Sequence, residues 1–122
     1  MQGIPEEPYV RHRSYAGQDV LLSLTFLNSA SVATEPTSIK YEVDSLETAT
    51  NVIPSTSVSP TGSTQILQLA GSLMQPTRPY FGRENMQVWI TAVIPDTNAS
   101  SGSITVQQVV IVELVNIAIP PT

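Results

Sequence analysis

The sequence predicts an all-β fold in which antiparallel strands pack as two sheets around one core. Two segments, 38–44 and 86–94, alternate apolar and polar residues, which is typical of strands with one buried face. A third segment, 103–115, contains a continuous apolar run. No segment keeps the helical period of about 3.6 residues, and Pro, Gly and Asn separate the apolar segments. These features favour strands throughout the chain.

An extended arm is expected to begin the chain, because Pro5 and Pro8 disfavour regular structure within residues 1–16. Pro54 places a weaker strand at a sheet edge, since proline cannot donate to a ladder. A crossover with a helical turn at 72–74 is expected over residues 71–83. Strands are predicted at residues 20–27, 38–44, 51–58, 64–69, 86–94 and 103–115. The resulting organisation is an arm at 1–16, a β-sandwich at 17–116 and a tail at 117–122.

The alternation also predicts which side chains face the core, because successive residues of a strand point to opposite faces. The apolar face is expected to carry Leu22, Leu24 and Phe26 in the first strong strand and Ile39, Tyr41 and Val43 in the next. The strand at 86–94 has Val88, Ile90, Ala92 and Ile94 on one face and Trp89, Thr91 and Val93 on the other.

Composition limits the functions open to the chain. Of its 122 residues, 41% are hydrophobic and 12% charged, with a net charge of -5 at pH 7. An acidic chain lacks the basic face that phosphate neutralisation needs, so no nucleic-acid partner is expected. The lack of cysteine excludes disulfides and thiolate metal sites. No apolar run reaches the roughly 18 residues of a membrane span, and no signal peptide is visible, so no membrane partner is expected.

The chain offers little catalytic chemistry. His12 is the only histidine, and it lies between Arg11 and Arg13, whose positive charge opposes the imidazolium that a catalytic triad must form. Glu42 and Asp44 share one strand face, but no aromatic residue is expected beside them as a platform for a sugar, so we interpret them as solvated surface residues. A calcium-like run from residue 96 to 102 has its glycine one position late. We therefore expect no enzyme activity, no cofactor and no metal.

Two segments carry a resemblance to a known superfamily. SIKYEVDS and MQVWITAVI, joined by a weak edge strand, a short strand and a proline-rich crossover, resemble the middle and sixth strands of immunoglobulin and fibronectin type III modules. The resemblance covers residues 17–115, although Trp89 stands in a later strand than the usual tryptophan and no Cys-Trp-Cys arrangement exists. It implies an antiparallel immunoglobulin-like β-sandwich of about seven strands, preceded by the N-terminal arm.

A cysteine-free sandwich of this size, without a secretion signal, is also similar to small virion proteins of tailed bacteriophages. This similarity implies a non-catalytic capsid decoration (cement) protein that resides in the virion and is assembled in the host cytoplasm. Its partners would be the major capsid protein or other virion subunits, with self-association, and it would bind through its arm and an apolar strand. The alternative is a tail or baseplate accessory protein, or a receptor- or carbohydrate-binding module.

Three groups of residues are candidates for partner binding. In the arm, Arg11 and Arg13 point the same way in an extended chain, and tyrosines flank them. The crossover supplies aromatic and arginine side chains, and the last strand carries apolar residues on the face away from the core, which we expect to be exposed unless the arm or another subunit covers it. The candidates are Tyr9, Arg11, Arg13 and Tyr15; Tyr80, Phe81 and Arg83; and Val109, Ile111 and Val115. Packing of the arm on its own sandwich, and of the crossover aromatics on the sandwich end, remain open alternatives.

Overall fold

The computed structural model describes residues 10–78 and 82–115. Within these ranges the chain forms seven strands and no helix, which confirms the all-β prediction. The strands are β1 (Val10–Tyr15), β2 (Val20–Thr25), β3 (Ser38–Ser45), β4 (Asn51–Val58), β5 (Thr64–Leu69), β6 (Arg83–Pro95) and β7 (Ser103–Val115). Six of them lie where the sequence predicts strands. β2 ends two residues earlier than predicted, and β6 begins three residues earlier.

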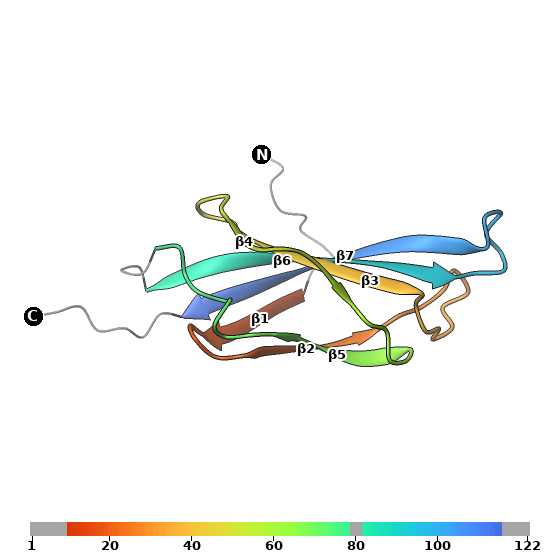
Figure 1. Ribbon diagram of the computed structural model, residues 1–122, viewed down its shortest axis with the longest axis horizontal. Helices are drawn as coiled ribbons and strands as arrows, with labels where there is room; N and C mark the ends of the chain where they lie inside the picture. Colours follow the sequence, from red (N-terminus) through yellow and green to blue (C-terminus); the bar gives the residue numbers. More distant parts are fainter. Residues whose placement is uncertain (1–9, 79–81, 116–122) are drawn as a thin grey trace, which may run out of the picture.

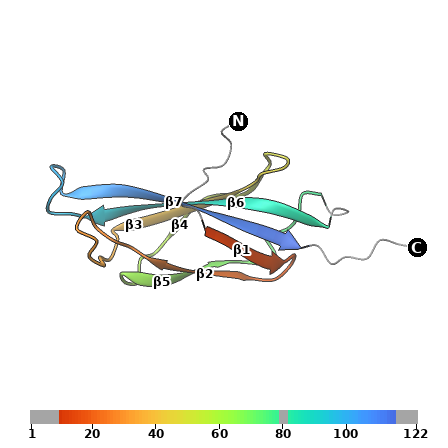
Figure 2. The ribbon, with the colours of Figure 1, turned by 180° about the vertical axis from the view of Figure 1, so that it is seen from behind.

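The described strands form two layers (Figure 1). The larger sheet has the order β1-β7-β6-β3-β4, and the smaller sheet pairs β2 with β5. β6 and β7 pair without interruption from Arg83↔Val115 to Pro95↔Ser103. The two views of Figures 1 and 2 show this long hairpin projecting past the end of the smaller sheet.

The core lies between the inner faces of the two sheets. The apolar face predicted for β3 is buried, and in β6 the buried face is the one that carries Val88, Ile90, Ala92 and Ile94. In β2, Leu22 and Phe26 are buried and Leu24 packs against the core from a partly exposed position. Met74, from the turn after β5, is fully buried as well. The alternation in the sequence therefore predicts the buried face of β2 and β3.

β1 corrects the expectation of an extended arm over residues 1–16 and of a purely antiparallel fold. It pairs in parallel with β7, from Val10↔Val110 to Tyr15↔Val115. Without β1, the second half of β7 would present unpaired backbone groups, which are costly where the flanking side chains are buried. The chain therefore uses residues 10–15 as a strand of its own domain.

The two edges of the larger sheet differ in how they are protected. β4 lies at one edge, as Pro54 predicts, and its pairing with β3 contains register shifts between Tyr41 and Asp44. Proline and bulges are two of the features by which natural proteins prevent an edge strand from pairing with another chain. The opposite edge is formed by β1 and, beyond it, by the first half of β7.

A buried glutamate fastens the crossover to the sheet. Glu84 is 1% exposed and accepts hydrogen bonds from the hydroxyl groups of Ser45 and Thr77. It also accepts the backbone N–H groups of Thr77 at 2.9 Å and Arg78 at 3.0 Å. Burial raises the pKa of the Glu84 carboxyl, but these hydrogen bonds outweigh it and hold the pKa below its ordinary value.

The turn between β1 and β2 packs directly against the chain that follows β5. A Cβ atom built on Gly71 would lie 2.3 Å from the carbonyl oxygen of Gly17, so only glycine fits there. The Asp19 carboxylate accepts the Gly71 N–H at 2.7 Å and the Gln68 side-chain amide at 2.7 Å. This contact holds the start of β2 against the end of β5.

Candidate functional site

One side of the domain is open. β1 covers β7 only from Val110 to Val115, and β2 has β5 as its only strand neighbour among the described residues. The edge of residues 103–109 of β7 that faces away from β6, and the outer edge of β2, therefore have no strand partner within the described part of the chain. Two unpaired strand edges, one from each sheet, border the same side of the core.

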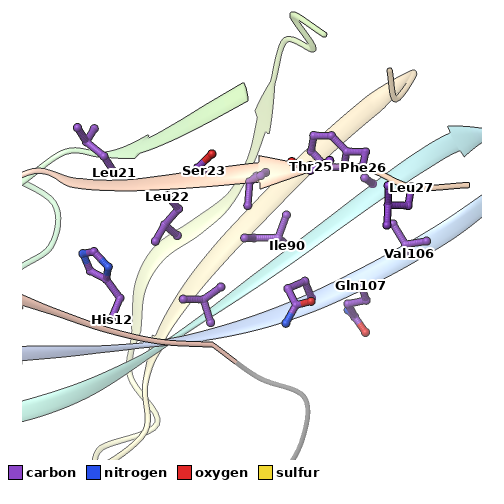
Figure 3. Close-up of a pocket in the computed structure, with 14 residues that line it drawn as sticks. His12, Leu21, Leu22, Ser23, Thr25, Phe26, Leu27, Ile90, Val106 and Gln107 are labelled. Carbon is purple, nitrogen blue, oxygen red and sulfur yellow. The ribbon is translucent and has the colours of Figure 1, made fainter. Parts of the chain in front are cut away.

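A groove of about 520 Å³ lies between these edges, and we call it the lateral groove. Figure 3 shows His12 from β1 and Leu22 from β2 pointing into it. Its lining comprises His12, residues 21–27, Ile90, Ala92, Val106, Gln107, Gln108 and Val110. Leu21 and Leu27 at its rim are 55% and 46% exposed. Most of this surface is apolar, and apart from His12 no ionisable side chain lines it.

The arginines of the arm lie on the outer face of the larger sheet, as an extended chain predicts. Arg13 is bound within its own domain, because its Nε donates to Glu113 at 2.8 Å. Arg83 donates to the other oxygen of the same carboxylate at 3.1 Å. The hydrogen bonds from Arg83 and then Arg13 lower the pKa of the Glu113 carboxyl. This cluster joins β1, β6 and β7.

The outer residues of the last strand were expected to be exposed unless the arm or another subunit covers them; Ile111 is 1% exposed, and Val109 and Val115 are half-buried. Ile111 stands between Arg11 of β1 and Gln87 of β6 in the register. Long side chains on both neighbouring strands flank it. The arm thus covers this face of the strand from within the same chain.

Of the remaining predicted binding residues, the structure describes one and leaves three outside the described ranges. Tyr15 is 47% exposed at the end of β1, and its contacts with a partner remain a prediction. Tyr9, Tyr80 and Phe81 lie outside the described residues.

A second, more polar site lies on the outer face of the larger sheet, where sequence reasoning expected no aromatic residue beside the acids. Trp89 pairs with Glu42 across the β3–β6 register and with Val109 of β7 on its other side, so the indole lies beside an acidic side chain. Trp89, Lys40, Glu42, Asp44, Thr91 and Gln107 are among the residues that line a hollow of about 320 Å³. The sequence contained the signal in the alternation of 86–94, but the register that joins Trp89 to Glu42 could not be predicted.

Asp96, a buried acid directly after β6, has structural partners. Asp96 is 3% exposed and accepts the backbone N–H of Ser29 and of Asn98, each at 2.9 Å. Hydrogen bonds from Ser29 and then Asn98 lower the pKa of the Asp96 carboxyl. Across the described residues, no group of three or more His, Cys, Asp or Glu side chains is placed to hold a metal ion. The described part also has no helix that is long and apolar enough to cross a membrane.

Comparisons of the chain with protein-family models, curated proteins and solved structures found no match.

Proposed function

We propose that the chain is a non-catalytic structural protein of a virion, a capsid decoration (cement) protein that assembles through the open side of its sandwich. The observation that carries this proposal is the lateral groove, an apolar and nearly uncharged cavity bordered by two unpaired strand edges. The exposed apolar surface at this groove comes from Leu21 and Leu27 at its rim and from the partly buried Leu24 and Val106, and another polypeptide could cover it. A subunit that is completed by its neighbours on a shell has such a surface.

The strand order supports the immunoglobulin-like part of the proposal. In immunoglobulin variable domains the sheet order runs G-F-C-C′, while strands B and E pair in the other sheet. The order β7-β6-β3-β4 and the pair β2-β5 correspond to these strands in both sequence and space. We therefore propose an immunoglobulin-like sandwich with β1 as an additional parallel strand at its edge.

Contact with the major capsid protein is assigned to residues 1–9. Residues 10–15 of the expected arm are part of the larger sheet, so they serve the domain itself. β1 begins beside the lateral groove, because Val10 pairs with Val110, one of the groove residues.

Deletion of residues 1–9 tests this assignment. Shells that lack the protein should bind the full chain and fail to bind the truncated one, while both proteins show the same thermal unfolding. A longer deletion through residue 15 would remove β1 and destabilise the domain, so it cannot serve as the test. Equal shell binding by the two proteins would contradict the role of the segment. Absence of shell binding by the full chain would contradict the decoration role.

The hollow beside Trp89 favours a second candidate, a carbohydrate-binding module of a phage tail. A half-buried indole offers an apolar face for a sugar ring, and Lys40 and Glu42 offer hydrogen-bonding groups beside it. Gln87, on the same face, has a buried side-chain nitrogen without a hydrogen-bond partner. Glycan-array binding that is lost in Trp89→Ala and kept in Val93→Ala, on the same face, would favour this function. No binding to any glycan would exclude it.

A further inference from the structure

The first half of β7 is the unguarded part of the larger sheet's edge. Residues 103–109 contain neither proline nor a charged residue, and their pairing with β6 is regular throughout. The β4 edge of the same sheet has Pro54 and register shifts. Natural proteins usually place charges, prolines or bulges on edges that must stay unpaired. The β4 edge therefore has features that prevent pairing and the β7 edge lacks them, which indicates that residues 103–109 pair with a further strand.

The backbone groups available for pairing follow from the β1–β7 ladder. The N–H of Ala16 donates to the carbonyl oxygen of Val115, so the backbone of Val115 faces this edge. Backbone groups alternate in direction along a strand, so those of the other odd-numbered residues face the same way. Thr105 and Gln107 therefore direct their N–H and C=O groups outward, where no described strand receives them.

From these features we infer that the β7 edge pairs with the same edge of a second copy of this chain. The inference rests on the proposed role as an assembling structural subunit and names one of its partners. An isologous, antiparallel pairing needs a self-complementary edge, which an uncharged run provides although the chain carries a net charge of -5. Any acidic edge would repel its own copy, whereas this one does not.

The register follows from symmetry. A two-fold axis at Val106 uses the whole free run and places Thr105 opposite Gln107 of the partner subunit. Their outward backbone groups then form hydrogen-bonded pairs, and the two Val106 residues form a non-hydrogen-bonded pair, in which side chains approach closely. Val106 lines the lateral groove, so the pairing brings the apolar grooves of two copies together at the axis.

The test measures the mass of the full chain in solution by light scattering. We expect a dimer of twice 13.1 kDa for the wild type, a monomer for Thr105→Lys, and a dimer for the control Ser55→Lys on the exposed β4 edge. Gln107→Pro should also give a monomer, because the backbone N–H that it removes faces the edge and the β6 ladder stays intact. Circular dichroism would verify that each variant is folded.

Cross-linking gives an independent readout, because the chain has no cysteine. Val106→Cys should form a disulfide-linked dimer under mild oxidation, and Ser55→Cys should not. A wild-type monomer at high concentration, or a dimer that Thr105→Lys leaves unchanged, would overturn the inference. If Thr105→Lys is monomeric yet the dimeric wild type does not bind shells, the pairing stands and the proposed function fails. If shells bind the wild type and it is a monomer, the proposed function stands and the pairing fails.

Discussion

Replacing Glu84 with glutamine is expected to lower the free energy of unfolding by about 1 kcal/mol at neutral pH, and Glu84→Ala by about 3 kcal/mol. One carboxylate oxygen accepts the N–H groups of Thr77 and Arg78, and the other accepts two hydroxyl groups. Glutamine keeps the first oxygen, and its NH₂ group can donate to the hydroxyls after they rotate. Only the contribution of the charge is lost, which is about 1 kcal/mol for hydrogen bonds of this kind.

Alanine removes every acceptor and leaves backbone N–H groups of the crossover without a partner in a buried position. Loss of several charge-assisted hydrogen bonds around a residue that is 1% exposed accounts for the larger value. Urea unfolding followed by the fluorescence of Trp89, the only tryptophan, would measure both variants. Equal losses for glutamine and alanine would refute the assignment of the stabilisation to hydrogen-bond geometry.

The difference in unfolding free energy between the wild type and Glu84→Gln should depend on pH. The pKa of Glu84 is lowered in the folded state, so its contribution to stability is complete above the unfolded value of about 4.3 and is lost as the pH falls through the folded pKa. Glutamine does not titrate. The difference in unfolding free energy between wild type and Glu84→Gln should therefore narrow below about pH 4.3. A difference that stays constant through acid pH would contradict the lowered pKa.

Two further substitutions test the backbone. Gly71→Ala should lower the unfolding free energy by about 2 kcal/mol or more, because its Cβ would meet the backbone of Gly17, whereas Gly82→Ala, which meets nothing within 4 Å, should leave urea unfolding nearly unchanged. Equal effects of the two would show that the close contact is absent. Ala49→Gly should raise the free energy of unfolding by about 0.5 kcal/mol and therefore raise the urea midpoint. The reason is that Ala49 has a φ of 59°, which glycine adopts without strain. A lower midpoint would mean that the entropy of glycine outweighs the relief of strain.

The strands that the sequence predicts are those whose burial is decided locally. In β3 the alternation itself specifies which face meets the core, and that face is as predicted. β6 carries apolar residues on both faces, so the alternation predicts the strand but not the face that is buried. The sequence did not predict β1 as a strand because its residues, VRHRSY, are mostly polar. Its strand partner among the described residues is β7, which is distant in the sequence: Arg13 of β1 and Glu113 of β7 are 100 positions apart. No local pattern carries information about such a distant partner.

The candidate site was predictable only in part for the same reason. The apolar excess of the last strand was visible, but the burial of Ile111 depends on which strands flank it in the sheet. The lateral groove depends on where β1 begins relative to β7, which only the register determines. Likewise, Trp89 and Glu42 are each visible in the sequence, while their proximity follows from the pairing of β3 with β6.

The parallel pairing of β1 with β7 also determines how the domain responds to tension between its ends. The chain enters β1 at Val10 and leaves β7 at Val115, which lie at opposite ends of the same ladder. A force that separates the two ends therefore slides one strand along the other and loads the ladder bonds together. If the first and last strands were antiparallel, the same force would unzip them one bond at a time. Pulled from both ends, the domain is loaded in shear, with the Arg13–Glu113 ion pair bridging the two sliding strands.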